Sequence, residues 1–235
     1  MGLIGIFARQ GDIFDIISYL FSVAIVLLLV MPIHEYAHGF IANKLGDPTP
    51  KYDGRLTLNP KAHLNYISIL SMIFIGFGAA NPVRVDSRYF DKPKRDMALV
   101  ALAGPISNLI FSFVACFIEV ALVYIPFLLG VSITGYAFTV INNLSTIFFY
   151  VSLLNINLAI FNLVPIPPLD GSKILFAILP DRFYWKFMRY ERYFYLGLLF
   201  LIFFSDSFSG VLSSMIRGVY GVFVDIATLP FELFI

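Results

Sequence analysis

Two histidines separated by three residues, with a glutamate after the first, are the part of this chain best suited to chemistry. The run HEYAH, His34 to His38, follows an apolar stretch, residues 16–33, that has no charged residue. Positions i and i+4 share one face of a helix, so both imidazoles can bind one metal ion. Glu35 lies on the neighbouring face, where it can accept a proton from metal-bound water. The pattern predicts a hydrolytic zinc site, because zinc lowers the pKa of bound water to about 7.

The alternative is that this motif arose by chance in an ordinary apolar helix. A charged residue at the centre of a bilayer costs roughly 2.5–3.5 kcal/mol on insertion scales. Ionisable residues in such a segment are therefore functional as a rule, which disfavours chance.

A catalytic zinc ion needs a third protein ligand and leaves a fourth position for water. The third histidine, His63, lies in a polar loop, and the single cysteine, Cys116, lies within an apolar run. Asp170 is the leading acidic candidate, in the segment NLVPIPPLDG at residues 162–171. Its prolines end a helix, and irregular backbone at membrane depth must be buried in protein or line a polar cavity. Asp170 is then either a metal ligand or the N-cap of a following helix over residues 171–179.

Three motifs in this order resemble the site-2 protease family of intramembrane zinc metalloproteases. They are HEYAH, AGPISN at residues 103–108 and NLVPIPPLDG at residues 162–171. The resemblance covers roughly residues 16–200 and is closest to compact members that consist of little beyond a catalytic core. It implies an intramembrane protease that contains one zinc ion per chain.

The resemblance also assigns individual roles. It implies that His34, His38 and Asp170 bind the zinc ion and that Glu35 is the catalytic base. It implies that Asn162 positions the substrate or polarises its carbonyl group.

Two further segments resemble the family less closely. Asn108 matches a position that implies helix packing and support of the site. Residues 54–60 with His63 are similar to a segment of the compact members, in which an Asp-Pro pair usually follows the histidine. Asn65 and Tyr66 stand there in this chain, which removes support for a catalytic role of the loop and leaves the metal site unaffected.

The composition is that of an integral membrane protein. The 235 residues are 59% hydrophobic and 13% charged, against about 25% charged in soluble domains. The net charge of +1 gives no reason to expect a nucleic-acid partner, and one cysteine excludes an internal disulfide. We expect residues 1–235 to form a single membrane-embedded metalloprotease domain without a PDZ domain. We expect no cleaved signal either, because the first apolar run carries the metal motif.

The apolar pattern predicts an all-α polytopic membrane protein with about four to six transmembrane helices. The first begins near Ile16 and continues towards Leu45, which is longer than the ~20 residues that a crossing needs. Pro32 predicts a kink that opens a wet pocket beside the ligands. Beyond it we expect spans over residues 97–124 and 136–163, an apolar helix over 193–204, and either a marginal span or an interfacial helix over 208–235.

Basic residues predict the orientation in the membrane. Five lie between Arg84 and Arg95 and five between Lys173 and Arg192, whereas residues 125–135 carry none. Because loops rich in lysine and arginine stay in the cytoplasm, we expect a multi-pass protein of the cell membrane with its active site near the cytoplasmic face. Residues 46–61 are also basic. If they too are cytoplasmic, residues 64–80 must re-enter the membrane rather than cross it, and we favour that alternative.

The expected partners are the lipid bilayer and membrane protein substrates with a transmembrane helix, and the protein could also form a homo-oligomer. A substrate helix must unwind before water can attack it, and a strand edge could hold the unwound segment. Residues 55–58 and 82–85 have short strand-like patterns that form either a small β element with such an edge or ordinary surface turns.

Two other classes of protein compete with the protease. A metal or small-solute transporter would explain the ligands but not Glu35, and the repeats of broken helices typical of transporters are not seen. An inactive membrane scaffold is disfavoured because every residue that the mechanism needs is present. Glu119, late in the span over residues 97–124, either relays protons, or extends its carboxylate to the membrane surface or pairs with another group, and we favour the last two.

Overall fold

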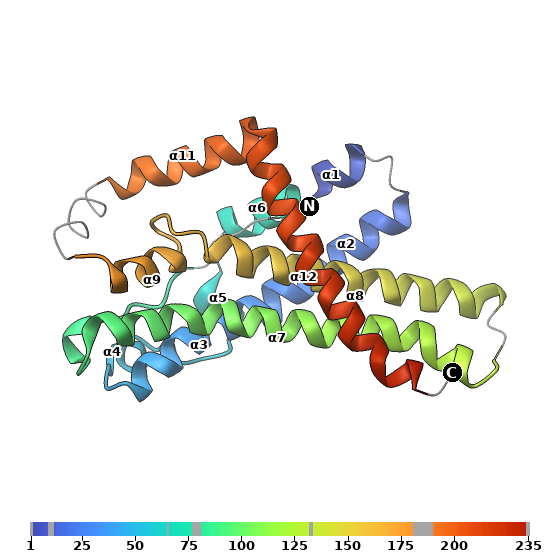
Figure 1. Ribbon diagram of the computed structural model, residues 1–235, viewed down its shortest axis with the longest axis horizontal. Coiled ribbons are helices and arrows are strands. Elements are labelled where there is room, and N and C mark those ends of the chain that lie inside the picture. The colour runs from blue at the N-terminus through green and yellow to red at the C-terminus, as the bar shows by residue number, and fades with distance from the viewer. Residues whose placement is uncertain are drawn as a thin grey trace.

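Helices running along the long axis of the molecule dominate the computed structural model, which describes residues 2–8, 12–64, 66–76, 81–131, 134–180 and 190–233 (Figure 1). Within those ranges there is no β-strand. Four helical segments of the described chain are long and apolar enough to cross a membrane: Ile13–Lys44, Pro93–Leu128, Gly135–Asn162 and Asp206–Glu232. The predicted all-α membrane class is confirmed.

The first helical run carries the HEYAH motif. It consists of α2 (Ile13–Ile25), the π-helical turn η1 (Val26–Val30) and α3 (Met31–Lys44). Asp12 caps its start by accepting a hydrogen bond from the backbone N–H of Asp15. Where Pro32 predicts a kink, the backbone widens, and the N–H of Met31 donates to the carbonyl of Val26. Such π-helical turns are frequent at functional sites.

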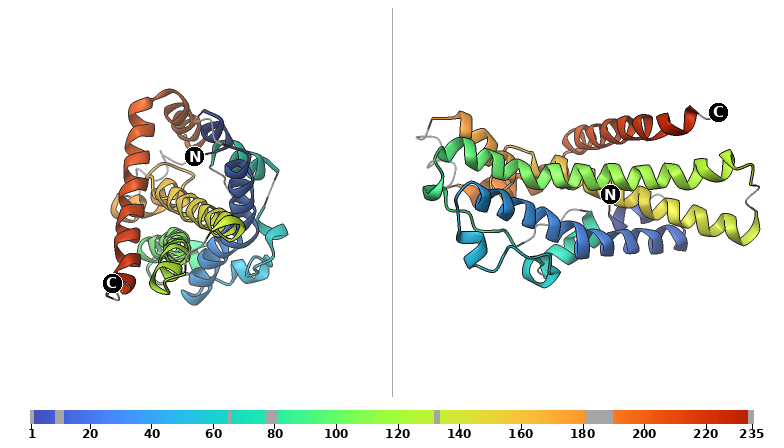
Figure 2. Two further views of the ribbon diagram at one scale, coloured as in Figure 1. Left: turned by 90° about the vertical axis from the view of Figure 1, so that its right-hand side faces the viewer. Right: turned by 90° about the horizontal axis from the view of Figure 1, so that it is seen from below.

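Helices α7 (Pro93–Leu128) and α8 (Gly135–Asn162) form an antiparallel pair at the centre of the molecule (Figure 2). The Ser112 hydroxyl lies 2.9 Å from both the backbone carbonyl and the hydroxyl of Ser152, so these two residues are opposite one another in the pair. Helix α3 packs against α7, and α2 packs against α8. The AGPISN segment of α7 is thereby placed against the HEYAH motif.

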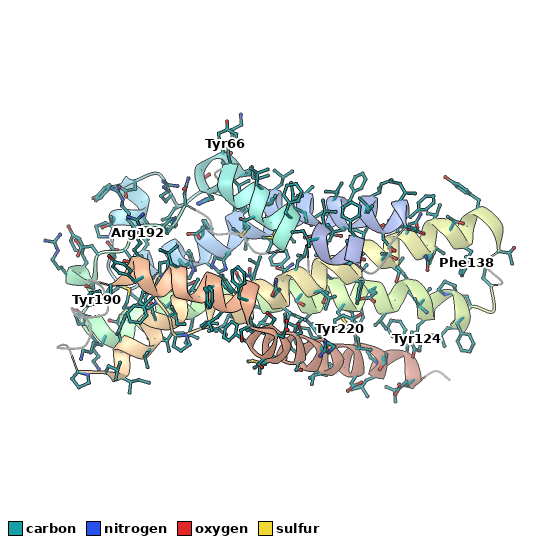
Figure 3. All side chains as sticks on the ribbon, turned by 90° about the horizontal axis from the view of Figure 1, so that it is seen from above. Tyr66, Tyr124, Phe138, Tyr190, Arg192 and Tyr220 are labelled. Carbon is teal, nitrogen blue, oxygen red and sulfur yellow. The ribbon has the colours of Figure 1, made fainter. Side chains whose placement is uncertain are left out.

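Helix α12 (Asp206–Glu232) crosses α8 and α7 (Figure 1). Its length and hydropathy make it a candidate span, which favours the marginal span over the interfacial helix for residues 208–235. Tyr220 on α12 donates a hydrogen bond to Glu119 on α7 at 2.7 Å, so the pairing alternative holds for Glu119 (Figure 3). The preceding helix α11 (Glu191–Phe204) has 14 residues and spans about 21 Å, too short for a bilayer core of about 30 Å.

Helix α6 (Tyr66–Ile75) occupies the stretch for which crossing and re-entrance were both open. Its ten residues span about 15 Å, half of a bilayer core. The Tyr19 hydroxyl on α2 donates to the carbonyl of Met72 at 2.8 Å and holds α6 inside the fold. These described residues favour re-entrance. Asn65 and residues 77–80 lie outside the described residues, as do three of the predicted cytoplasmic cations, Arg182, Lys186 and Arg189.

The predicted β element is not formed, because neither residues 55–58 nor residues 82–85 are strands. Their backbone and side-chain donors bond to other groups. Arg55 donates from its backbone to Pro50 and from its guanidinium to Ala62, within a loop that carries the short helices α4 (Thr49–Tyr52) and α5 (Pro60–His63). Residues 81–86 have no regular secondary structure, and Val83 donates to Glu35 rather than to a neighbouring strand.

Candidate metal centre

Three side chains from two distant parts of the chain converge at one buried point. The Nε2 atoms of His34 and His38 are 3.1 Å apart, and the Asp170 Oδ2 atom lies 3.6 Å from the first and 3.1 Å from the second. Zinc–ligand bonds of about 2.0–2.1 Å in tetrahedral geometry place ligand atoms about 3.3–3.4 Å apart. The three atoms therefore have the spacing that one zinc ion requires.

His38 is held in the orientation that a metal ligand needs. Its Nδ1 atom lies 2.7 Å from the carbonyl oxygen of Val100 on α7. A backbone carbonyl at this position fixes the tautomer with the proton on Nδ1, so that Nε2 presents its lone pair to the metal. The Nδ1 atom of His34 is buried without a partner among the described residues.

Asp170 reaches the histidines because α8 ends at Asn162 and the chain turns back through a proline-rich loop into α9 (Asp170–Ile178). A Cβ at Gly171 would lie 2.2 Å from the carbonyl oxygen of Leu163, so only glycine allows α9 to approach this closely. Asp170 is the first residue of α9, whose N-cap, Leu169, makes no side-chain capping bond. Of the two alternatives for Asp170, the geometry therefore favours the metal ligand over the N-cap.

The charge state of Asp170 suits this role. Its Oδ1 atom lies 3.1 Å from the Lys173 ammonium one turn along α9, which leaves Oδ2 to face the histidines. Burial raises the pKa of the Asp170 carboxyl, but the neighbouring His38 and His34 rings and the Lys173 ammonium together hold that pKa well below its usual range. The carboxylate is therefore ionised at neutral pH, as metal binding requires.

Glu35 is buried, with 6% of its surface exposed, and lies outside the group of three ligands. Its Oε2 atom accepts a hydrogen bond of 3.0 Å from the backbone N–H of Val83 in the non-helical segment 81–86. The placement leaves Glu35 beside the ligands without making it one of them. A general base needs this arrangement.

Gly104 is a site residue that sequence reasoning did not single out. A Cβ at this position would lie 2.3 Å from Nε2 of His38 and 2.6 Å from Nε2 of His34, close to the point where the metal would sit. Helix α7 can line the metal centre only because this residue has no side chain. The glycine of the AGPISN motif was the signal that pointed to it.

Replacement of Gly104 by alanine is expected to reduce zinc content from about one ion per chain to a small fraction of it. The methyl group would displace two imidazoles in a packed site, where overpacking costs about 1–3 kcal/mol. Metal analysis of purified protein measures the loss. Gly218→Ala on α12, where nothing lies within 4 Å of the added Cβ, is the matched control and should keep its zinc. Full zinc content in the Gly104 variant would contradict this placement of the metal.

The other predicted site residues are less directly tied to the three ligands. Asn162 is the last residue of α8 and is half-buried, and its catalytic role stays a prediction. Asn108 is fully buried one turn after Gly104 on α7. His63 donates a hydrogen bond from Nε2 to the carbonyl of Thr57 at 2.8 Å, which gives it a structural role in its loop.

Two imidazoles and one carboxylate, buried among helices long enough to cross a membrane, define a membrane-embedded zinc hydrolase. The comparisons with known proteins specify it further. Residues 128–204 match the model of Peptidase family M50. YwhC of Bacillus subtilis is 38% identical over 178 residues, which are 75% of this chain and 78% of that protein.

Two more distant relatives agree with this result. Rip2 of Mycobacterium tuberculosis is 30% identical over 63% of this chain and 53% of its own length. MJ0392 of Methanocaldococcus jannaschii is 26% identical over 71% of this chain and 37% of its own length. The names of all three relatives describe zinc metalloproteases. No solved structure matches the chain.

The chain belongs to the M50 peptidases, the site-2 protease family, and is a zinc metalloprotease of the membrane. The resemblance that its three motifs predicted is confirmed. Membership of a peptidase family also decides against the transporter.

Proposed function

We propose that this protein hydrolyses a peptide bond within or near a transmembrane segment of membrane protein substrates, in regulated intramembrane proteolysis. One observation carries the proposal. The HEYAH motif is part of the 32-residue apolar segment Ile13–Lys44, and His34, Glu35 and His38 are each at most 6% exposed. A peptidase whose base and ligands lie within a membrane helix is suited to a substrate that reaches it through the membrane.

The residues divide the chemistry among them. His34, His38 and Asp170 would hold the zinc ion, which would lower the pKa of a bound water molecule and polarise the substrate carbonyl. Glu35 takes the proton from the attacking water and passes it to the leaving amine. The amide of Asn162 donates a hydrogen bond to the substrate carbonyl oxygen, where negative charge develops. The Val83 N–H orients the Glu35 carboxylate for these transfers.

The segment 81–86, which belongs to no helix, is suited to bind an unwound substrate. Three of its N–H groups hold it in place: Asn81 donates to the His63 carbonyl, Val83 to Glu35, and Asp86 to Asp47. An extended substrate chain could lie along this segment by β-addition, which would bring a peptide bond next to Glu35. We propose this although the segment is not part of a sheet in the described residues.

We further propose that the protein is a multi-pass protein of the cell membrane and that its active site lies near the cytoplasmic face. Helix α3 ends at Lys44, α7 begins after Lys92, and Asp170 begins α9, all at one end of the molecule (Figure 1). This basic end is typical of the cytoplasmic side. Aromatic residues lie near both ends, with Tyr190 at this end and Phe138 at the opposite one, as membrane-interface anchors do (Figure 3).

The test is a comparison of membrane proteomes from cells that express the wild-type protein or the Glu35→Gln variant. Substrates should accumulate uncut in the variant, and their cut sites in the wild type should map within or near a transmembrane segment. Cut sites confined to soluble domains far from the membrane would contradict the proposal.

A further inference from the structure

In the part of the chain that the structure describes, three buried side chains on α3, α7 and α8 have polar atoms without hydrogen-bond partners. They are Nδ1 of His34 on α3, both amide atoms of Asn108 on α7, and Oδ1 of Asn155 on α8. The residues are 4%, 0% and 0% exposed, respectively. Buried polar groups are nearly always hydrogen-bonded, so unpartnered atoms on three adjoining helices call for an explanation.

The helix register places Asn108 opposite Asn155. Helices α7 and α8 are antiparallel, and Ser112 meets Ser152 at 2.9 Å. Asn108 lies one turn before Ser112, and Asn155 lies about one turn after Ser152. Both amides therefore face the same α7–α8 interface.

The contacts between α3 and α7 indicate that the amide of Asn108 lies near His34. The His38 ring contacts the carbonyl of Val100 on α7. Gly104 follows Val100 by one turn and lies directly against the His34 ring, because a Cβ at Gly104 would be 2.5 Å from the Cε1 atom of His34. Cε1 is bonded to Nδ1. Asn108 follows Gly104 by one turn on the same face, and a helical side chain leans towards the residue four before it. Because Gly104 has no side chain between them, this spacing would direct the Asn108 amide towards the unpartnered edge of His34.

We propose that Asn108 is a positioning residue for His34 and acts through one internal water molecule bound among His34, Asn108 and Asn155. Such a water needs two to four polar partners, and the three side chains supply them. The water would accept the Nδ1–H of His34 and so hold Nε2 unprotonated towards the metal, as the Val100 carbonyl does for His38. This inference rests on the metal site and not on the choice of substrate.

The proposal and a purely structural role for Asn108 predict opposite results for Asn108→Leu. If the amide were simply unsatisfied, a leucine of similar size would raise thermal stability and leave zinc affinity unchanged. If the amide orients His34, zinc affinity should fall about 10–100-fold, the usual effect of removing such a partner of a metal ligand.

The experiment measures zinc affinity of purified protein in detergent by competition with a chelator, in the absence of substrate. Asn155→Leu should give a smaller loss of zinc affinity. Asn108→Asp keeps an acceptor oxygen, so it should bind zinc at least about ten times more tightly than Asn108→Leu. Ser112→Ala is the matched control: it breaks a buried hydrogen bond on the same face of α7, further from the metal, and should not change zinc affinity.

Asn108→Ala serves as a second variant, since it removes both amide atoms without adding bulk, and its zinc affinity should also fall. Zinc affinity within twofold of the wild type in a folded Asn108→Leu or Asn108→Ala variant overturns the proposal. The result is independent of whether any membrane protein is cleaved, so failure here is distinguishable from failure of the proposed function.

Discussion

Glu35→Gln is expected to keep the zinc ion and to lower peptide cleavage by roughly 10²–10⁴-fold, the usual contribution of a general base. Glutamine has nearly the same shape, and its side-chain oxygen can still accept the hydrogen bond from the Val83 N–H. The fold and the three ligands should therefore persist. What is lost is the carboxylate that takes a proton from water. The measurement is cleavage of a co-expressed membrane substrate, with zinc content determined on the same protein.

The matched control for this variant is Glu119→Gln on α7. Glu119 is a half-buried carboxyl of the same kind, but it pairs with Tyr220 on α12. A glutamine can still accept the hydrogen bond from the tyrosine, so both activity and zinc content should stay near those of the wild type. Retained cleavage in Glu35→Gln would remove Glu35 as the base. Equal loss in both variants would point to general damage to the helices.

Asp170→Ala is expected to lose nearly all bound zinc and, with it, all cleavage. Two histidines on one helix remain, and a catalytic zinc site needs three protein ligands. The substitution also leaves the Lys173 ammonium, 3.1 Å from Asp170 in the wild type, without its partner beside the metal position. A positive charge there would repel the ion further. Metal analysis of the purified protein gives the zinc content per chain.

Asp91→Asn supplies the comparison for Asp170→Ala. Asp91 is exposed just before α7 and is not part of the metal group. Its loss should leave zinc content unchanged. If Asp170→Ala still carried one zinc ion per chain, Asp170 would not be a ligand, and the convergence of α3 and α9 would need another explanation.

Local sequence determined much of this protein. The spacing of His34 and His38 requires a helix to aim both rings at one point, and the apolar residues before them require that helix to be in a membrane. Long apolar runs predicted α7 and α8 to within a few residues at each end. These features depend on neighbours in the chain, so they can be read without knowing what packs against them.

Other features depend on residues distant in sequence. The strand-like pattern of residues 82–85 left a β edge and an ordinary surface turn both open, because whether a segment pairs depends on what lies beside it. Here the neighbour is the Glu35 carboxylate, which takes the Val83 N–H. The alternative roles of Asp170 could not be separated either, because an N-cap and a metal ligand after a proline loop have the same local signature. Only the return of α9 to within 3.1 Å of His38 distinguishes them.

The sequence by itself determined the chemistry: the kinds of ligands, the base, the membrane helices and the family. The tertiary structure alone decided the geometry of the site. Its two parts lie more than a hundred residues apart in the sequence and come into contact beside Gly104 of α7. Gly104 shows the physical reason. Its importance lies in an absent side chain, and that absence has a meaning only once two imidazoles are known to occupy the space in front of it.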